Sequence, residues 1–273
     1  MNLTPKNNVQ EFEQFLFEEI DLNLYEHKFL NDYVGKAIRG LAPLYELSVI
    51  NTSPNGWIMI LHGEILLVYG NSWNEQQIEE IKEVFDLNKF TNYSIAGDNI
   101  IIDKLIELYK PKNLEIEKRR LLYCTNEINR FNVDNLKIRL GAFEEIDELA
   151  TMLQQYYHEE YDGFNDKTIE EMRQRIISLI EAEKIYVLLD MDETLLSFCT
   201  VIDPDIGILF TKQEHRNRGY GKVILSYCSQ LLQQKNEKVY VMTDRDKPES
   251  NIVCEAVGFK PFYTYIMIKI NCG

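Results

Sequence analysis

Residues 210–222 read Phe-Thr-Lys-Gln-Glu-His-Arg-Asn-Arg-Gly-Tyr-Gly-Lys, and this stretch decides the fold. It joins a short apolar strand, expected at residues 206–211, to a helix that begins near Tyr220. A glycine-containing turn that opens a helix directs several backbone N–H groups at one spot, and the helix N-terminus adds a partial positive charge there. The arginines and lysines of the stretch add full charges. The stretch is therefore interpreted as a cradle for a pyrophosphate.

Other readings of the same window exist. One is an ordinary helix start with two glycines, because glycine is common at turns. Another is a dinucleotide-binding turn, which requires Gly-x-Gly-x-x-Gly and an acid about 20 residues further on. Gly219 and Gly221 fit its first half and Asp244 fits the acid, but Ile224 stands where the third glycine belongs. A P-loop is excluded, since the sequence has no Gly-x-x-x-x-Gly-Lys-Ser/Thr.

The Arg-x-x-Gly-x-Gly turn resembles the acyl-CoA pyrophosphate loop of the GNAT N-acetyltransferase superfamily, and the resemblance continues downstream. In members of the superfamily, the helix that this turn opens is followed by a strand and then by a second helix. That second helix commonly begins with Asn-Pro-x-Ser and is followed by Gly-Phe. Here Pro248 and Ser250 match, as do Gly258 and Phe259, while Lys247 replaces the usual asparagine. The succession of these motifs is more specific than any one of them, and it predicts a GNAT domain in the C-terminal half.

The pattern of apolar residues in this half agrees with a GNAT fold, a mixed sheet with helices on both faces. Thr168 and Glu171 form a capping box that predicts the start of the second helix. The expected strands are 136–143, 184–190, 194–202, 206–211, 238–243 and a last one ending near residue 270. The expected helices are 144–160, 168–183, 221–234 and 247–258.

The N-terminal half alternates strands and helices as well and is expected to be a smaller α/β domain. Its turn at residues 70–74 reads Gly-Asn-Ser-Trp-Asn and lacks the phosphate-binding pattern. It resembles a degenerate, reduced GNAT half, as in tandem proteins of the glycine N-acyltransferase type. The expected domains are 1–130 and 136–273, joined by a polar linker. The expected helices are 9–41, 74–85 and 98–109, and the expected strands are 47–52, 57–61, 64–69, 93–96 and 118–126.

Composition excludes several classes of protein. The net charge of −15 disfavours partners such as nucleic acid and anionic lipid, which are bound mainly through lysine and arginine. No apolar run reaches the length of a membrane span, and the first residues lack the apolar core of a signal peptide. Five scattered cysteines and four histidines suggest neither disulfides nor a metal site. We therefore expect a cytoplasmic protein, monomeric or homodimeric, without a metal.

The resemblance implies roles for particular residues. Backbone groups of a splayed strand would hold the acyl carbonyl and the pantetheine arm, and the turn would hold the pyrophosphate of acetyl-CoA. Asn251 on a later helix would face the pantetheine. The implied cofactor-binding residues are Leu209, Phe210, Thr211, Arg216, Asn217, Arg218, Gly219, Tyr220, Gly221, Lys222 and Asn251.

Catalysis is harder to assign. Many members use a tyrosine as the acid four residues before the Gly-Phe pair, and that position is Cys254 here. A thiol can in principle protonate a thiolate leaving group, since the two pKa values are similar. The alternative is a small buried residue that only packs. Tyrosines that could supply the hydroxyl instead are Tyr220, Tyr263 and Tyr265. Carboxylates near the central strand that could act as the base are Glu214, Asp203 and Asp205.

The end of the helix at 144–160 usually borders the acceptor site in this fold. Tyr157 and Glu160 would there form an aromatic and acidic wall that suits a cationic amine. The sequence thus predicts an acetyl-CoA-dependent N-acyltransferase that acts on an amine of a small molecule or peptide by direct attack. The alternative is a non-catalytic module that binds or senses acyl-CoA.

Overall fold

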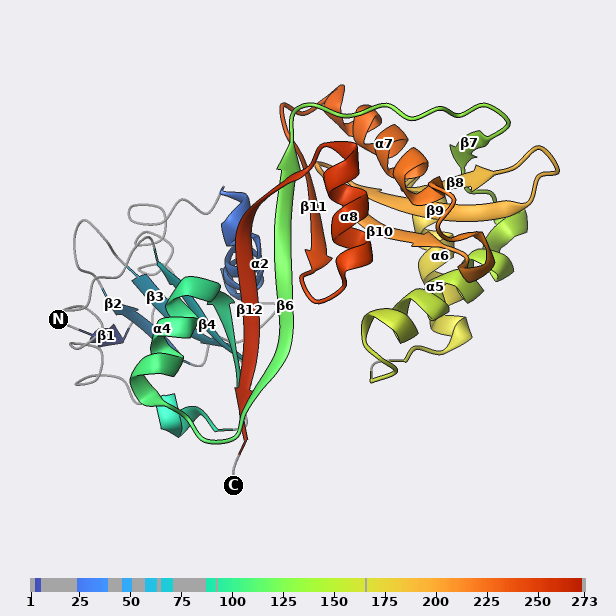
Figure 1. The fold of residues 1–273 in the computed structure, drawn as a ribbon. Helices are drawn as coiled ribbons and strands as arrows, with labels where there is room; N and C mark the ends of the chain where they lie inside the picture. Colours follow the sequence, from blue (N-terminus) through green and yellow to red (C-terminus); the bar gives the residue numbers. More distant parts are fainter. Residues whose placement is uncertain are drawn as a thin grey trace. The chain divides into compact units, whose positions relative to one another are not determined.

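A computed structural model describes residues 3–5, 24–38, 46–50, 57–62, 65–70, 87–91, 93–164 and 166–271 (Figure 1). The chain divides into two compact units. Unit 1 comprises Met1–Leu121 and Tyr263–Gly273, and unit 2 comprises Leu122–Phe262. The divisions fall inside two long strands, β6 (Leu114–Thr125) and β12 (Lys260–Ile270). These units group the chain by contact, and the domain ranges expected from the sequence stay a prediction.

The sheet of unit 1 has the order β1-β2-β3-β4-β5-β12-β6. Strands β1 to β4 pair antiparallel, β4 pairs parallel with β5, and β5 pairs antiparallel with β12. The first five strands of this unit are β1 (Leu3–Pro5), β2 (Glu46–Ile50), β3 (Trp57–His62), β4 (Ile65–Gly70) and β5 (Ser94–Asp98). The helical elements of this unit are η1 (Tyr25–His27), α2 (Lys28–Ile38), η2 (Leu87–Phe90) and α4 (Asn99–Tyr109).

Helix α4 begins where the sequence predicts it, because Asp98 caps it. The Asp98 carboxylate accepts hydrogen bonds from the N–H groups of Ile100 and Ile101 at 2.9 and 3.1 Å. The apolar side of α4 packs on β4, β5 and β12. The buried residues of this core are Leu66, Val68, Leu87, Ile95, Ile101, Ile102, Leu105, Ile266, Ile268 and Ile270.

The sheet of unit 2 has the order β6-β11-β10-β9-β8-β7. Its strands are β7 (Lys137–Leu140), β8 (Ile185–Leu189), β9 (Leu195–Ile202), β10 (Asp205–Thr211) and β11 (Val239–Asp244). Strands β7, β8, β9 and β10 pair antiparallel in chain order, with two helices between β7 and β8. Strands β10 and β11 pair parallel. The helical elements are η3 (Phe143–Glu145), α5 (Ile146–Glu160), α6 (Ile169–Glu181), η4 (Gln213–His215), α7 (Tyr220–Gln233) and α8 (Pro248–Val257).

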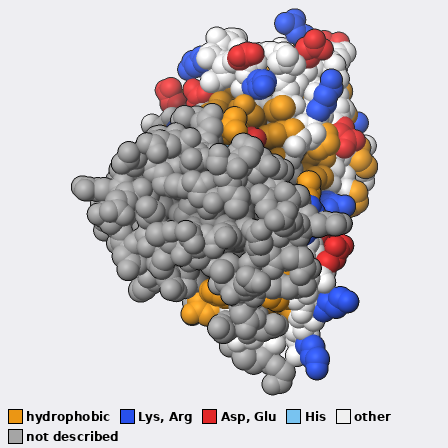
Figure 2. Space-filling view, turned by 90° about the vertical axis from the view of Figure 1, so that its left-hand side faces the viewer, with side chains coloured by type: hydrophobic (Ala, Val, Ile, Leu, Met, Phe, Trp, Pro, Cys, Tyr) orange, Lys and Arg blue, Asp and Glu red, His pale blue; other side chains and the backbone are white. Residues whose placement is uncertain are grey.

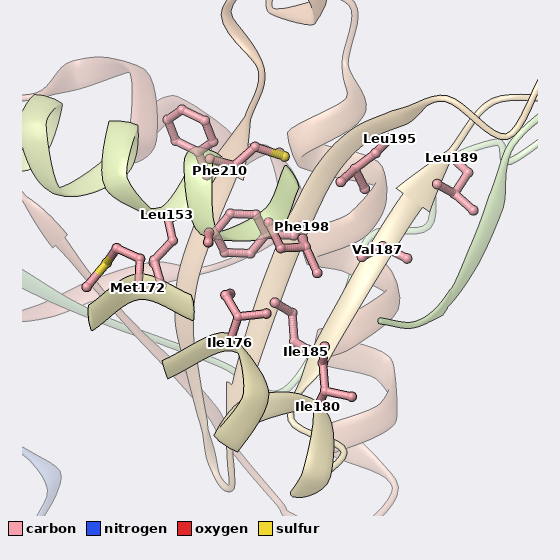
Figure 3. Packing of buried hydrophobic residues seen from close by; sticks show 13 residues of the cluster. Leu153, Met172, Ile176, Ile180, Ile185, Val187, Leu189, Leu195, Phe198 and Phe210 are labelled. Atoms are coloured by element: carbon pink, nitrogen blue, oxygen red, sulfur yellow. The ribbon is translucent and has the colours of Figure 1, made fainter. Parts of the chain in front are cut away.

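Helices α5 and α6 cover one face of this sheet and enclose its main core. Figure 3 shows Phe198 and Phe210 of the sheet beside Leu153 of α5 and Met172 and Ile176 of α6. Thr168 caps α6 as its sequence predicts: its hydroxyl accepts from the N–H of Glu171, whose carboxylate accepts from the N–H of Thr168. Local capping and burial of an apolar stripe thus fix both helices.

Helix α7 covers the opposite face of the sheet (Figure 1). Successive residues of a strand point to opposite faces, so Phe198 points to α5 and α6 while its neighbour Cys199 meets the thiol of Cys228 on α7. Helix α8 lies on this second face too, since Cys199 is close enough to the thiol of Cys254 to raise its pKa. The layers α5–α6, sheet and α7–α8 match the fold class expected from the sequence.

The polar segment expected as a linker is tied to unit 2. The N–H of Asn129 donates to the carbonyl of Val257 at 2.9 Å, and the Asn129 carbonyl accepts from the Ser226 hydroxyl at 2.6 Å. Of the helix expected at residues 9–41 in unit 1, the described part forms η1 and α2. The expected helix at 74–85 and the turn after Gly70 lie outside the described residues, as do both central residues of the hairpin between β3 and β4.

Acidic and basic side chains are interspersed on the described surface that Figure 2 shows. No helix of the described residues combines the length and the apolar character that crossing a membrane requires.

Candidate functional site

Strand β10 separates from β11 shortly after it begins. Asp205 and Ile206 pair with Tyr240 and Val241, and these are the register positions of the parallel pair. Strand β10 then continues beside β9 alone, with a register shift between Ile206 and Leu209. A splay opens at this point between two parallel strands in the middle of the sheet.

The register shift depends on Gly207. A Cβ at this position would lie 2.4 Å from the Oγ1 of Thr200, closer than any real contact. That same oxygen accepts a hydrogen bond of 2.6 Å from the N–H of Ile208, replacing a bond of the ladder. Glycine is therefore required for the irregularity that lets β10 depart from β11.

The backbone groups that face the splay follow from strand alternation. The N–H groups of Ile208 and Lys212 point to β9, where they donate to Thr200 and Leu196. The intervening odd residues, Leu209 and Thr211, therefore direct their backbone groups away from β9 and toward the splay. The carbonyl of Thr211 accepts a hydrogen bond of 3.0 Å from Nε of Arg216.

The turn between β10 and α7 leaves a row of backbone donors unused. Asn217 and Gly219 have positive φ values of 61° and 86°, and Gly219 occupies the N-cap position without a side-chain cap. In the described part of the chain, the N–H groups of residues 218–221 donate to no other group. A Cβ on Gly219 would meet nothing within 4 Å, so the surroundings of this residue are open. This arrangement fits a phosphate group.

The basic residues around this turn fall into two groups. Lys212 forms an ion pair with Glu148 of α5, and Arg216 lies 2.9 Å from the carboxylate of Glu159 at the end of the same helix. Arg218 and Lys222 make no ion pair within the described residues, and the side chain of Arg218 is exposed. The charge available to an anion in front of the turn is therefore that of Arg218 and Lys222.

Asn251 of α8 is engaged within unit 2. Its Oδ1 accepts from the Thr243 hydroxyl at 2.5 Å, and its Nδ2 donates to the carbonyls of Asp244 and Arg245 at 3.2 and 3.3 Å. These bonds tie the start of α8 to the end of β11, which is the other border of the splay. A contact of Asn251 with a ligand stays a prediction.

Cys254 is buried, with 3 % of its surface exposed. Burial, together with the nearby Cys199 and Glu255, raises the pKa of its thiol to about 12. Glu255 accepts a hydrogen bond of 3.3 Å from the hydroxyl of Tyr123, whose own pKa burial raises to about 12. A thiol this weakly acidic is poorly matched to a thiolate leaving group, so burial favours the packing role weighed for Cys254.

Tyr157 and Glu160, the two residues expected at the acceptor wall, do not line the groove found next to them. The hydroxyl of Tyr157 accepts from Arg175 of α6 at 2.5 Å, and its ring stacks on that of Tyr161 at 6.0 Å. A groove of about 490 Å³ lies beside them and is lined by their polar neighbours rather than by Tyr157 or Glu160. The lining residues are Gln154, Gln155, His158, Glu159, Asp166 and Gln213. His158 is 3.0 Å from the carboxylate of Asp166.

The other candidates for proton transfer have separate surroundings. Asp203 accepts a hydrogen bond of 2.6 Å from Asn236, and Glu214 is exposed in η4. Tyr263 and Tyr265 belong to unit 1, where Tyr263 lies beside Asp98. Tyr220 opens α7, with its ring 6.4 Å from that of His215. Among these, Tyr220 is the hydroxyl that lies in the turn itself.

The comparisons with known proteins agree with this architecture. Residues 199–267, which hold β10, the turn, α7, β11 and α8, match the family model described as FR47-like protein, a GNAT-related family. Over these residues the chain is similar to that family. No curated protein matches the sequence significantly.

Solved structures align over nearly the whole chain, and GNAT proteins are among them. An acetyltransferase of the GNAT family from Colwellia psychrerythraea is 14% identical, with a TM-score of 0.55 and 98% of each chain covered. A tandem GNAT protein from the clavulanic acid biosynthesis pathway is 10% identical, with a TM-score of 0.51 and coverage of 98% of this chain and 97% of that one. A Drosophila protein is 14% identical with a TM-score of 0.59, covering 98% of both chains. The match to a tandem GNAT protein confirms the fold class expected for both halves.

Proposed function

We propose that the protein is an acetyl-CoA-dependent N-acyltransferase whose donor site is the splay and turn of unit 2. The observation that carries this proposal is the departure of β10 from β11 directly before a turn with unused N–H donors. The splay supplies backbone groups to an extended pantetheine arm, and the turn supplies N–H groups to a pyrophosphate. The family of the similar structures supports the same reaction class.

The turn, rather than its side chains alone, binds the pyrophosphate in this proposal. The N–H groups of residues 218–221 have no partner among the described residues, the α7 N-terminus adds a partial positive charge, and a Cβ on Gly219 would meet nothing within 4 Å. Arg218 and Lys222 add their charges at this turn. The other predicted donor contacts, from Leu209 to Thr211, lie on the adjoining strand. All of these belong to one continuous segment, so a single ligand can bind along it.

The groove beside α5 is the proposed place of the acceptor. Its lining is polar and contains two carboxylates, Glu159 and Asp166, and it adjoins the turn through Gln213. In the reaction, the lone pair of a neutral amine forms a bond to the thioester carbon. The C–S bond then breaks, the amine nitrogen loses a proton, and the thiolate of coenzyme A leaves and takes up a proton.

The alternative is an acyl-CoA-binding protein without turnover, and one observation favours it. The position that usually holds the catalytic tyrosine is filled by the buried Cys254, whose thiol is a weak acid. An assay of thiol release from acetyl-CoA separates the two functions. Release that depends on an added small amine or peptide supports the enzyme, whereas acetyl-CoA binding without release across such a panel supports the binding module.

A further inference from the structure

Arg216, the first residue of the Arg-x-x-Gly-x-Gly pattern, binds its own chain through Nε and Nη2. Its Nε donates to the carbonyl of Thr211 at 3.0 Å. Its Nη2 donates to both carboxylate oxygens of Glu159, each at 2.9 Å. Its guanidinium carbon lies 5.1 Å from the ring centroid of Phe210, so the plane of the group also contacts an aromatic face. These contacts fix the guanidinium at the end of β10.

Glu159 makes a second connection through its backbone. Its carbonyl accepts a hydrogen bond from Nζ of Lys247, which also lies 3.8 Å from the carboxylate of Asp162. Lys247 is the N-cap residue of α8, directly after the turn that follows β11. The end of α5 is therefore tied to both borders of the splay: to β10 through Arg216 and to the start of α8 through Lys247.

We propose that Arg216 and Glu159 are positioning residues, and that the charge which binds the pyrophosphate comes from Arg218 and Lys222. This inference rests on the proposed function and assigns separate roles within its donor site. The charge of Arg216 is neutralised by Glu159, and its Nε and Nη2 donors are used within the chain, so it holds the shape of the turn and the end of the splay. Because it covers the carbonyl of Thr211, it leaves the backbone groups of Leu209 and the N–H of Thr211 as those available to pantetheine.

The proposal makes Arg216 irreplaceable by lysine. A guanidinium is a planar fork that can donate to the Thr211 carbonyl and to Glu159 at once while its face lies on Phe210. An ammonium keeps the charge but cannot reproduce this fork. A residue that served the phosphate only as a charge would tolerate the exchange, so Arg216→Lys distinguishes the two roles.

The test is a calorimetric titration of the full-length protein with coenzyme A at about 0.05 and 0.3 M salt, because screening weakens contacts between exposed charges. We expect Arg216→Lys, which keeps the charge, to weaken binding by about three- to tenfold with the salt dependence of the wild type, and Arg216→Gln to weaken binding at least as much. Arg218→Gln should instead flatten the salt dependence. Glu181→Gln, an exposed acid near the end of α6, is the control for loss of one carboxylate.

A double variant tests whether the two residues act together. Since both belong to one network, Glu159→Ala combined with Arg216→Lys should bind coenzyme A within about twofold of Arg216→Lys alone. Should the Arg216 variants fail to fold, Glu159→Ala decides the question, because the loss of its contact with Arg216 must weaken binding although the Arg216 charge stays in place. Melting temperatures measured alongside identify such a failure.

Three results overturn the proposal while leaving the proposed function intact. These are wild-type affinity in Arg216→Lys, wild-type affinity in Glu159→Ala, or losses from Glu159→Ala and Arg216→Lys that multiply in the double variant. A wild-type protein that does not bind coenzyme A overturns the proposed function and this inference together.

Discussion

Ile206 lies opposite Val241 in the parallel ladder, and it is the last residue of β10 that pairs with β11. Beyond Ile206, β10 pairs with β9 and no longer with β11. The irregularity lies in the interior of the sheet, where lost ladder bonds are costly unless something replaces them. Here the Thr200 hydroxyl replaces one of them, and β10 leads into the turn that opens α7.

Gly207→Ala is predicted to destabilise the protein by about 1–3 kcal/mol, because the new Cβ would collide with the Oγ1 of Thr200. Chemical denaturation monitored by circular dichroism measures the change. Gly221→Ala is the matched comparison, since a Cβ there would have its nearest contact at 3.6 Å. Equal stability of the two variants would mean that Gly207 does not control the irregularity.

Gly219→Asp is predicted to abolish coenzyme A binding, by about 100-fold or more, because a carboxylate would enter the space that the phosphate needs. The fold should survive, since nothing lies within 4 Å of the new Cβ and an acid suits a helix N-terminus. Gly219→Ala, which adds only the strain of a positive φ, is the control and should still bind. Normal binding by Gly219→Asp would show that the phosphate site lies elsewhere.

Cys254→Ala is predicted to change turnover by less than about twofold and to cost about 1 kcal/mol of stability, as expected for a buried side chain that only packs. Thiol release from acetyl-CoA with a saturating amine measures the first, and thermal unfolding the second. A drop in turnover of tenfold or more at unchanged coenzyme A affinity would instead identify Cys254 as the catalytic acid.

Stability is predicted to fall as the pH rises above about 9. The pKa of Cys254 in the folded protein is about 12, above its ordinary value of 9.0, so the unfolded chain loses this proton first. Between these two values the unfolded state binds fewer protons, and the free energy of unfolding decreases by about 1.4 kcal/mol per pH unit for this one group. Denaturation curves at pH 8 to 11 (about 1 unit apart) should show a shallower decrease in Cys254→Ala than in the wild type. Parallel curves would contradict the buried, protonated thiol.

Local signals in the sequence predicted much of unit 2. The capping box of Thr168 and Glu171 gave the start of α6, and the glycine turn gave the start of α7, because both depend on neighbouring residues only. The same holds for Asp98 and α4 in unit 1. These features depend on residues within a few positions of one another, which is the range over which sequence patterns are informative.

Long-range contacts could not be predicted in this way. Glu159 and Arg216 are far apart in the sequence, and an acidic residue at a helix end is usually solvated, so nothing local marks the pair. The roles of Gly207 and Thr200 likewise depend on the register of two strands. That the last strand from Tyr263 groups with unit 1 depends on tertiary contacts as well.

The most direct test of the central claim is titration calorimetry of the full-length protein with acetyl-CoA, with NAD as the control ligand. The account predicts saturable binding of acetyl-CoA, no binding of NAD, and a raised melting temperature, because a ligand at 100 times its dissociation constant stabilises the fold by about 2.7 kcal/mol. Absence of acetyl-CoA binding, or binding of NAD in its place, would contradict it.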